Sequence, residues 1–178
     1  NLKTYIIDSD SPHEIDDAIS LEITKSNKKK IWIHISNPCS LFSSESNIDL
    51  EARKKNCSLY LTDQYVPMLP KNIIDKANLA QNKVSNTISA SIELDNKGSI
   101  INYEIVEAMI KPKYQLTYED ANDIFEIEPK EEIDLVELKN LLFKSISYRK
   151  KNGAIIFETP TSKLRLNEGK VILTRVDK

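Results

Sequence analysis

The segment that decides how this sequence is interpreted is Ile7-Asp8-Ser9-Asp10-Ser11-Pro12-His13-Glu14-Ile15-Asp16-Asp17-Ala18. It is rich in carboxylates, and no lysine or arginine lies between Lys3 and Lys25 to neutralise them. Adjacent carboxylates repel one another, so a fold that gathers them must offset the repulsion. Apolar strand patterns flank the segment, with Asp8 ending the first strand and Asp16 and Asp17 beginning the next. We therefore expect the loop to bring several carboxylates to one point.

Clustered carboxylates of this kind predict a site for a hard cation. Oxygen ligands favour Mg²⁺ or Mn²⁺, or Ca²⁺ where about six to eight oxygens converge. A Ca²⁺ loop of the EF-hand type is excluded, because Pro12 and His13 stand where that loop has a ligand and a glycine. Mg²⁺ held by a few carboxylates indicates phosphoryl chemistry. Two alternatives remain open, namely a solvated acidic loop and a loop whose cation serves only the fold.

Composition narrows the class of protein. The chain has 178 residues, a net charge of 25 − 27 = −2 and 40% hydrophobic residues, which suits a globular domain rather than a disordered tail. No apolar run approaches the roughly 20 residues of a membrane span, so no membrane partner is expected. With three glycines, the chain has no glycine-rich phosphate loop. Cys39 and Cys57 lack metal-ligand spacing, which predicts reduced thiols and a cytoplasmic location.

Periodicity predicts mostly strands in the first two thirds of the chain. Alternating apolar residues indicate strands over 5–8, 19–23, 31–35, 88–94 and 99–110. Polar turns at 26–30 and 96–98 make hairpins of two adjacent pairs. Short strands are also expected over 154–157 and 171–175.

Helices are expected at three places. One runs over 48–55 with Asn47 as its cap, and one follows Thr117, whose capping box includes Asp120. The longest covers 133–151, with Gly153 placed to end it. The predicted fold class is therefore mixed α/β of the α+β type, with largely antiparallel strands and hairpins and a few helices.

Several motifs, in order, resemble the RNase II/RNase R exoribonucleases, whose catalytic domain is the RNB domain. The acidic segment resembles that signature, an Asp followed by acids six, eight and nine residues later. Further matching segments are Ile33-His34-Ile35, Ser58-Leu59-Tyr60-Leu61, Val66-Pro67-Met68-Leu69-Pro70, Leu116-Thr117-Tyr118-Glu119-Asp120 and Arg149-Lys150-Lys151-Asn152-Gly153-Ala154. Residues 1–178 thus resemble the N-terminal half of the catalytic domain. The resemblance implies that the rest of the domain and the flanking cold-shock and S1 RNA-binding domains lie outside this chain.

The resemblance also implies an activity and its residues. The family hydrolyses single-stranded RNA processively from 3′ to 5′, releasing nucleoside 5′-monophosphates with Mg²⁺, or with Mn²⁺ as an alternative ion. By position, the metal ligands would be Asp8, Glu14, Asp16 and Asp17, of which Asp16 and Asp17 would be catalytic and Asp16 most needed. The residues expected to bind RNA are Tyr60 and Tyr118, which match tyrosines that pack on the 3′-terminal nucleotides, and Arg53, in a positive patch before Tyr60.

One departure from the family concerns Glu14, which stands where an Asp is usual and adds a methylene that can shift the metal geometry. The alternative function is a catalytically inactive RNA-binding or protein-interaction module derived from the RNB fold. Clustered negative charge argues against a pure binder of phosphate. The 178-residue chain by itself is expected to be inactive, because the family's charge-stabilising arginine lies beyond the matched segments.

Overall fold

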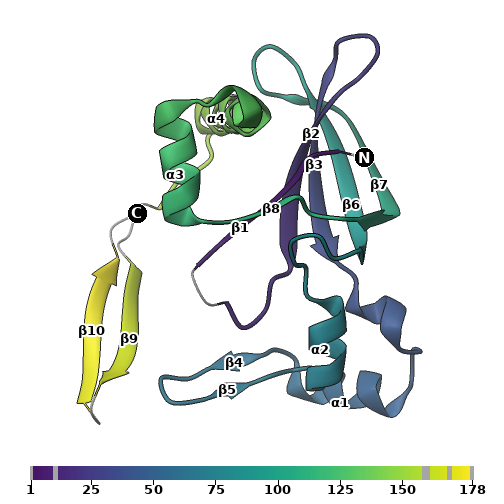
Figure 1. Ribbon diagram of the computed structural model, residues 1–178, viewed down its shortest axis with the longest axis vertical. Helices are drawn as coiled ribbons and strands as arrows, with labels where there is room; N and C mark the ends of the chain where they lie inside the picture. Colours follow the sequence, from purple (N-terminus) through teal and green to yellow (C-terminus); the bar gives the residue numbers. More distant parts are fainter. Residues whose placement is uncertain (1, 10–11, 158–160, 168–169, 177–178) are drawn as a thin grey trace.

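The computed structural model describes the chain except for residues 1, 10–11, 158–160, 168–169 and 177–178. A mostly antiparallel six-stranded sheet dominates the described part, in the order β7-β6-β3-β2-β1-β8 (Figure 1). Its strands are β1 (Thr4–Asp8), β2 (Asp17–Ile23), β3 (Lys29–Ser36), β6 (Ser85–Leu94), β7 (Ile100–Ile110) and β8 (Tyr114–Thr117). The neighbouring strands are antiparallel except β1 and β8, which run parallel. The predicted fold class is confirmed.

The helices and short strands frame this sheet. The helical elements are η1 (Pro38–Leu41), α1 (Asn47–Lys55), α2 (Lys71–Ala77), α3 (Tyr118–Ile127), η2 (Lys130–Glu132) and α4 (Ile133–Lys151). Two small hairpins complete the fold, formed by β4 (Leu59–Tyr60) with β5 (Tyr65–Val66) and by β9 (Thr161–Asn167) with β10 (Lys170–Val176). Among the helices of the described ranges, none has the length and apolar character needed to cross a bilayer.

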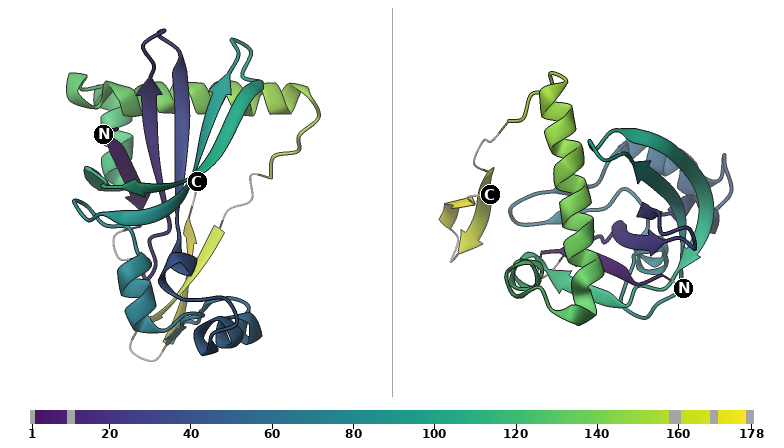
Figure 2. Two further views of the ribbon diagram at one scale, coloured as in Figure 1. Left: turned by 90° about the vertical axis from the view of Figure 1, so that its right-hand side faces the viewer. Right: turned by 90° about the horizontal axis from the view of Figure 1, so that it is seen from above.

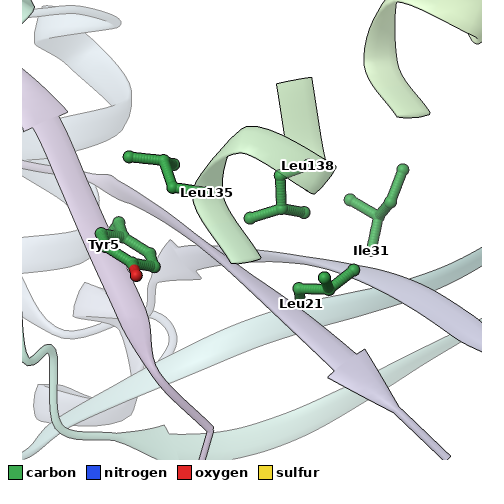
Figure 3. Packing of buried hydrophobic residues seen from close by; sticks show 5 residues of the cluster. All are labelled: Tyr5, Leu21, Ile31, Leu135 and Leu138. Carbon is green, nitrogen blue, oxygen red and sulfur yellow. The ribbon is translucent and has the colours of Figure 1, made fainter. Parts of the chain in front are cut away.

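The main core lies between α4 and one face of the sheet. Helix α4 runs across the strands in Figure 2. Leu135 and Leu138 of α4 pack on Tyr5, Leu21 and Ile31, which come from β1, β2 and β3 (Figure 3). These five side chains are at most 6% exposed, and burying each apolar side chain of this size contributes about 1.5–3 kcal/mol. The alternation of β1 explains the arrangement, because Tyr5 faces α4 while the next residue faces the other side.

Two smaller apolar clusters hold the loops that carry the acids. Buried residues from β1, the acidic loop, β2, the segment after α2, and β7 form one of them: Ile6, Ile15, Ala18, Leu79 and Ile110. Helix α2 contributes the other, in which Ile73 and Ile74 pack with Leu69. The buried side chain of Ile15 therefore anchors the acidic loop to the core, while Asp16 and Asp17 are exposed.

A chain of hydrogen bonds crosses the sheet at buried positions. Thr4 Oγ1 and Ser20 Oγ are 2.8 Å apart, and Ser20 Oγ is 3.0 Å from His34 Nε2. On the other side of the ring, His34 Nδ1 is 2.8 Å from Ser89 Oγ, which in turn is 2.8 Å from Thr87 Oγ1. Burial lowers the pKa of His34 to about 4, so the imidazole is neutral near pH 7.

The turn between β6 and β7 requires its glycine. Gly98 has φ +91°, and a Cβ there would lie 2.3 Å from the carbonyl oxygen of Lys144 in α4. Only glycine allows the hairpin to approach the helix this closely. The predicted turn at 96–98 thus also sets the distance between the sheet and α4.

Three predictions about local structure need comment. Helix α1 is capped by Ser46, whose hydroxyl accepts from the amide of Asp49, so the prediction of Asn47 as cap was wrong by one residue. The capping box of Thr117 and Asp120 is confirmed. The strand predicted over 154–157 is wrong, because that segment forms no strand and the partner of β10 is Thr161–Asn167.

Candidate active site

Strand pairing places Asp8, Asp17 and Tyr118 close together although they are far apart in sequence. Asp8 ends β1 opposite Thr117 in the parallel pair with β8, and Tyr118 follows as the first residue of α3. Asp17 begins β2 opposite Ile35 of β3. Burial, followed by repulsion from Asp8 and Asp17, raises the pKa of Tyr118. The tyrosine ring is 55% exposed and therefore available to a ligand.

Asp16 is held by the end of β3. Its backbone carbonyl accepts from the Ser36 amide at 2.7 Å, and its carboxylate accepts from the Ser36 hydroxyl at 3.2 Å. Partial burial, then repulsion from Glu14, Asp17 and Asp8, raises the pKa of Asp16 despite the Ser36 hydrogen bond. Partial burial, then repulsion from Asp8, also raises the pKa of Asp17. The two adjacent acids therefore experience the mutual repulsion that the sequence predicted.

The Glu14 carboxylate is hydrogen-bonded to the β4–β5 hairpin. Its Oε1 accepts from the Ser58 hydroxyl at 2.9 Å and from the Tyr65 hydroxyl, and its Oε2 accepts from the Tyr60 hydroxyl at 2.9 Å. Partial burial disfavours the charged form, but these three hydroxyl groups outweigh it and hold the pKa of Glu14 below its ordinary value. Glu14 and Asp16 line the same cavity of about 240 Å³, which Ser58 and residues of α2 also border.

Residues after α2 fix the backbone of the acidic loop. The Asn78 side chain accepts from the amide of Ile15 at 3.4 Å and donates to the carbonyl of His13 at 3.3 Å. The amide of Leu79 donates to the Ile15 carbonyl at 3.0 Å. Sequence reasoning missed this role of Asn78, and also missed Ser36, Ser58 and Tyr65 as partners of the acids.

The remaining predicted residues differ in their placement. Tyr60 is 60% exposed and lies on β4, with its hydroxyl on Glu14. Arg53 lies on α1, where its guanidinium pairs with Asp49 at 2.9 Å and Glu45 at 3.3 Å. Asp10, which the sequence groups with the other acids, lies outside the described residues. The role of Arg53 in RNA binding stays a prediction.

The described acids are neighbours without forming a closed metal cage. Within the residues that the structure describes, no three His, Cys, Asp or Glu side chains are gathered closely enough to hold a metal ion. Carboxylate donors have the chemistry that Mg²⁺ prefers. Their arrangement in this conformation, with Glu14 turned to the hairpin, does not by itself fit a bound ion.

Comparison with known proteins identifies the family. Residues 1–178 match the RNB domain. This chain belongs to the RNB domain family. It is 34% identical over 167 residues to an uncharacterized ribonuclease of Synechocystis, and 33% identical over 167 residues to the chloroplastic/mitochondrial ribonuclease II of Arabidopsis thaliana. Each match covers 93% of this chain but only 25% and 20%, respectively, of the relative, so the RNB chain spans about a quarter to a fifth of their length.

Solved structures share the fold of this RNB chain. The RNase R of Mycoplasma genitalium in complex with double-stranded RNA has a TM-score of 0.83 at 20% identity, over 99% of this chain and 33% of that protein. An active-site mutant of the Dss1 exoribonuclease from Candida glabrata reaches 0.86 at 23% identity, over 99% of this chain and 26% of that protein. Yeast Ssd1, described as a pseudonuclease, reaches 0.69 at 19% identity, over 80% of this chain and 18% of that protein. The fold is thus common to proteins described as a nuclease and as a pseudonuclease.

Proposed function

We propose that this chain contributes the acidic part of the active site of a cytoplasmic exoribonuclease. The enzyme would hydrolyse single-stranded RNA processively from its 3′ end, with Mg²⁺ or Mn²⁺, and release nucleoside 5′-monophosphates. The observation that carries the proposal is the strand pairing that places Asp8, Asp16, Asp17 and the exposed Tyr118 at one end of the sheet. Membership of a family that includes named ribonucleases supports it.

In the proposed reaction, a water oxygen bonds to the phosphorus of the last phosphodiester. The bond from phosphorus to the 3′ oxygen of the preceding nucleotide breaks, that oxygen takes up the proton that the water releases, and the phosphate leaves on the terminal nucleoside. Asp16 and Asp17 would orient the attacking water, because they are adjacent in the chain and both residues remain accessible to solvent. The exposed rings of Tyr60 and Tyr118 would stack on bases without sequence preference, at about 1–3 kcal/mol per base.

The dependence on a divalent cation is inferred from repulsion within the site. Partial burial, and then repulsion from neighbouring acids, raises the pKa of Asp16 and of Asp17, and a bound cation would offset that repulsion. Phosphate oxygens from RNA would add further negative charge at the same place. Without a cation, an RNA end should therefore bind poorly beside these acids.

The test compares Asp16→Asn with Asp123→Asn in the full-length protein. Asp123 is an exposed acid of α3 and provides a matched loss of charge away from the site. On end-labelled single-stranded RNA with Mg²⁺, Asp16→Asn should lower the turnover number roughly a thousandfold. Asp123→Asn should behave like the unaltered protein, and EDTA should stop turnover in both unaltered and control proteins. Normal turnover in Asp16→Asn would refute the assignment.

The second candidate is an RNB-derived module that binds RNA or protein without cleavage, which the likeness to Ssd1 favours. It predicts RNA binding with no shortening of the RNA, in the presence or absence of Mg²⁺. The same assay, run on the unaltered full-length protein, separates the two candidates. The segment 1–178 alone should release no mononucleotide, because the relatives are about four to five times longer.

A further inference from the structure

The hairpin that carries Tyr60 has little structure of its own. Its strands β4 and β5 are two residues each, and a small isolated hairpin is marginally stable in water. Its backbone is closed by a hydrogen bond from the Leu61 amide to the Gln64 carbonyl, at 2.9 Å. Something outside the hairpin must therefore hold Tyr60 in place.

Side chains of the acidic loop hold Tyr60 and its hairpin in place. Glu14 accepts hydrogen bonds from Ser58, Tyr60 and Tyr65, one before the hairpin and two within it. The ring of His13 stacks on Tyr65, with centroids 4.5 Å apart and planes 2° apart. Tyr65 in turn lies beside Tyr60, with centroids 5.2 Å apart. Glu14, two residues before Asp16, is thus connected to the exposed side chain of Tyr60.

We propose that Glu14 anchors the hairpin in this protein rather than binding the catalytic cation, and that Ser58 and Tyr65 are positioning residues for Tyr60. The inference rests on the proposed function, because it takes Tyr60 as the ring on which an RNA base stacks. It removes Glu14 from the carboxylates that the proposed function gives to the cation and leaves Asp8, Asp16 and Asp17.

The hydroxyl donors around Glu14 explain why this carboxylate is not assigned as a ligand of the cation. A carboxylate offers about four lone-pair directions, and three hydroxyl groups already occupy Glu14. A metal ion would have to displace one or more of these charge-assisted hydrogen bonds, which are stronger than neutral ones.

The inference is tested first by metal binding without RNA, using Mn²⁺ and Mg²⁺ titrated into the full-length protein. Glu14→Gln should leave the dissociation constant within about twofold, whereas Asp17→Asn should raise it tenfold or more. If Glu14→Gln weakens binding as much as Asp17→Asn does, Glu14 is a ligand and the inference is overturned. Calorimetry gives this result whether or not the protein cleaves RNA.

Amide hydrogen exchange over residues 59–66 tests the anchor directly. Glu14→Gln and Tyr65→Phe should each speed exchange in this segment by about tenfold, because each removes at least one hydrogen bond involving the carboxylate. The matched control is Tyr103→Phe, which changes an exposed tyrosine of β7. Unchanged exchange in both hairpin variants would overturn the inference.

Kinetics on single-stranded RNA then separate positioning from catalysis. Tyr65→Phe should raise KM about fivefold to tenfold and change kcat less than twofold, because the acids are untouched while Tyr60 is less ordered. Glu14→Asp keeps the charge but not the reach, so it should resemble Tyr65→Phe. A fall in kcat with unchanged KM would contradict the positioning role. If the unaltered protein cleaves no RNA, the proposed function fails, and hydrogen exchange still decides the anchor.

Discussion

Glu14 and His34 both have hydroxyl groups as hydrogen-bond partners, yet the pKa shifts favour a charged glutamate and a neutral histidine. At the surface, three hydroxyl groups surround Glu14 and favour its ionised form. Inside the sheet, two serine hydroxyls hold His34, which is 4% exposed, and burial keeps the ring neutral. The neighbouring groups are alike, but three donated hydrogen bonds outweigh the partial burial of the Glu14 carboxylate, whereas burial alone decides for the His34 imidazole. The surroundings, rather than the donor type, decide the charge state.

The largest expected effect comes from removing the buried ring. His34→Ala would leave a cavity and deprive the Ser20 and Ser89 hydroxyls of a partner, so the free energy of unfolding should fall by about 3–4 kcal/mol. Urea denaturation measures the change. The control is His13→Ala, because His13 is exposed, and this variant should change stability by less than about 1 kcal/mol. If both variants lowered the free energy of unfolding equally, the burial of His34 would not account for its contribution to stability.

The pH dependence of stability sharpens the same contrast. The folded-state pKa of His34 is about 4, below its ordinary 6.5, so the unfolded chain binds more protons between these values. The stability due to the neutral ring is fully present above pH 6.5 and is lost as the pH falls towards 4, by about 3 kcal/mol in total. Urea titrations between pH 7 and pH 4 should show this loss in the unaltered protein. The loss should be smaller in His34→Ala, and an identical pH profile would disprove the assignment.

The hydrogen bonds of Glu14 should contribute less to stability than the burial of His34. Their contribution should also be lost at lower pH. The pKa of Glu14 is below its ordinary 4.5, so its contribution is present above pH 4.5 and is lost as the pH falls through the folded-state value. Glu14→Gln should lower the free energy of unfolding by about 1 kcal/mol at pH 7, and by less at pH 3.5. Chemical denaturation at the two pH values checks this. A larger loss at pH 3.5 than at pH 7 would reverse the expected sign.

The sequence was sufficient to predict the strands and helices whose pattern depends only on residues close together in the chain. Alternation over two residues predicted the central strands β2, β3 and β6, and the turn at Gly98 predicted their neighbour β7. The capping box at Thr117 predicted the start of α3. These signals depend on residues a few positions apart, so they can be interpreted without knowing what packs against them.

Strands and helices that depend on partners distant in the sequence were not predicted. Strand β8 is four residues long and is defined by its parallel pairing with β1, more than a hundred residues earlier in the chain. Helix α2 and the β4–β5 hairpin are short, and they are held by packing and by Glu14 rather than by a strong pattern. The strand predicted over 154–157 had the right composition but no partner strand.

For the site, the sequence by itself determined which acids are clustered and that they must repel, because adjacency and the lack of nearby cations are visible in the order of residues. Only the tertiary structure decided that strand pairing places Asp8 opposite Thr117, next to Tyr118, and that Glu14 is hydrogen-bonded to the hairpin. The physical reason is that the direction of a side chain depends on its nearest hydrogen-bond donors. Those donors come from segments that folding, not sequence order, brings alongside.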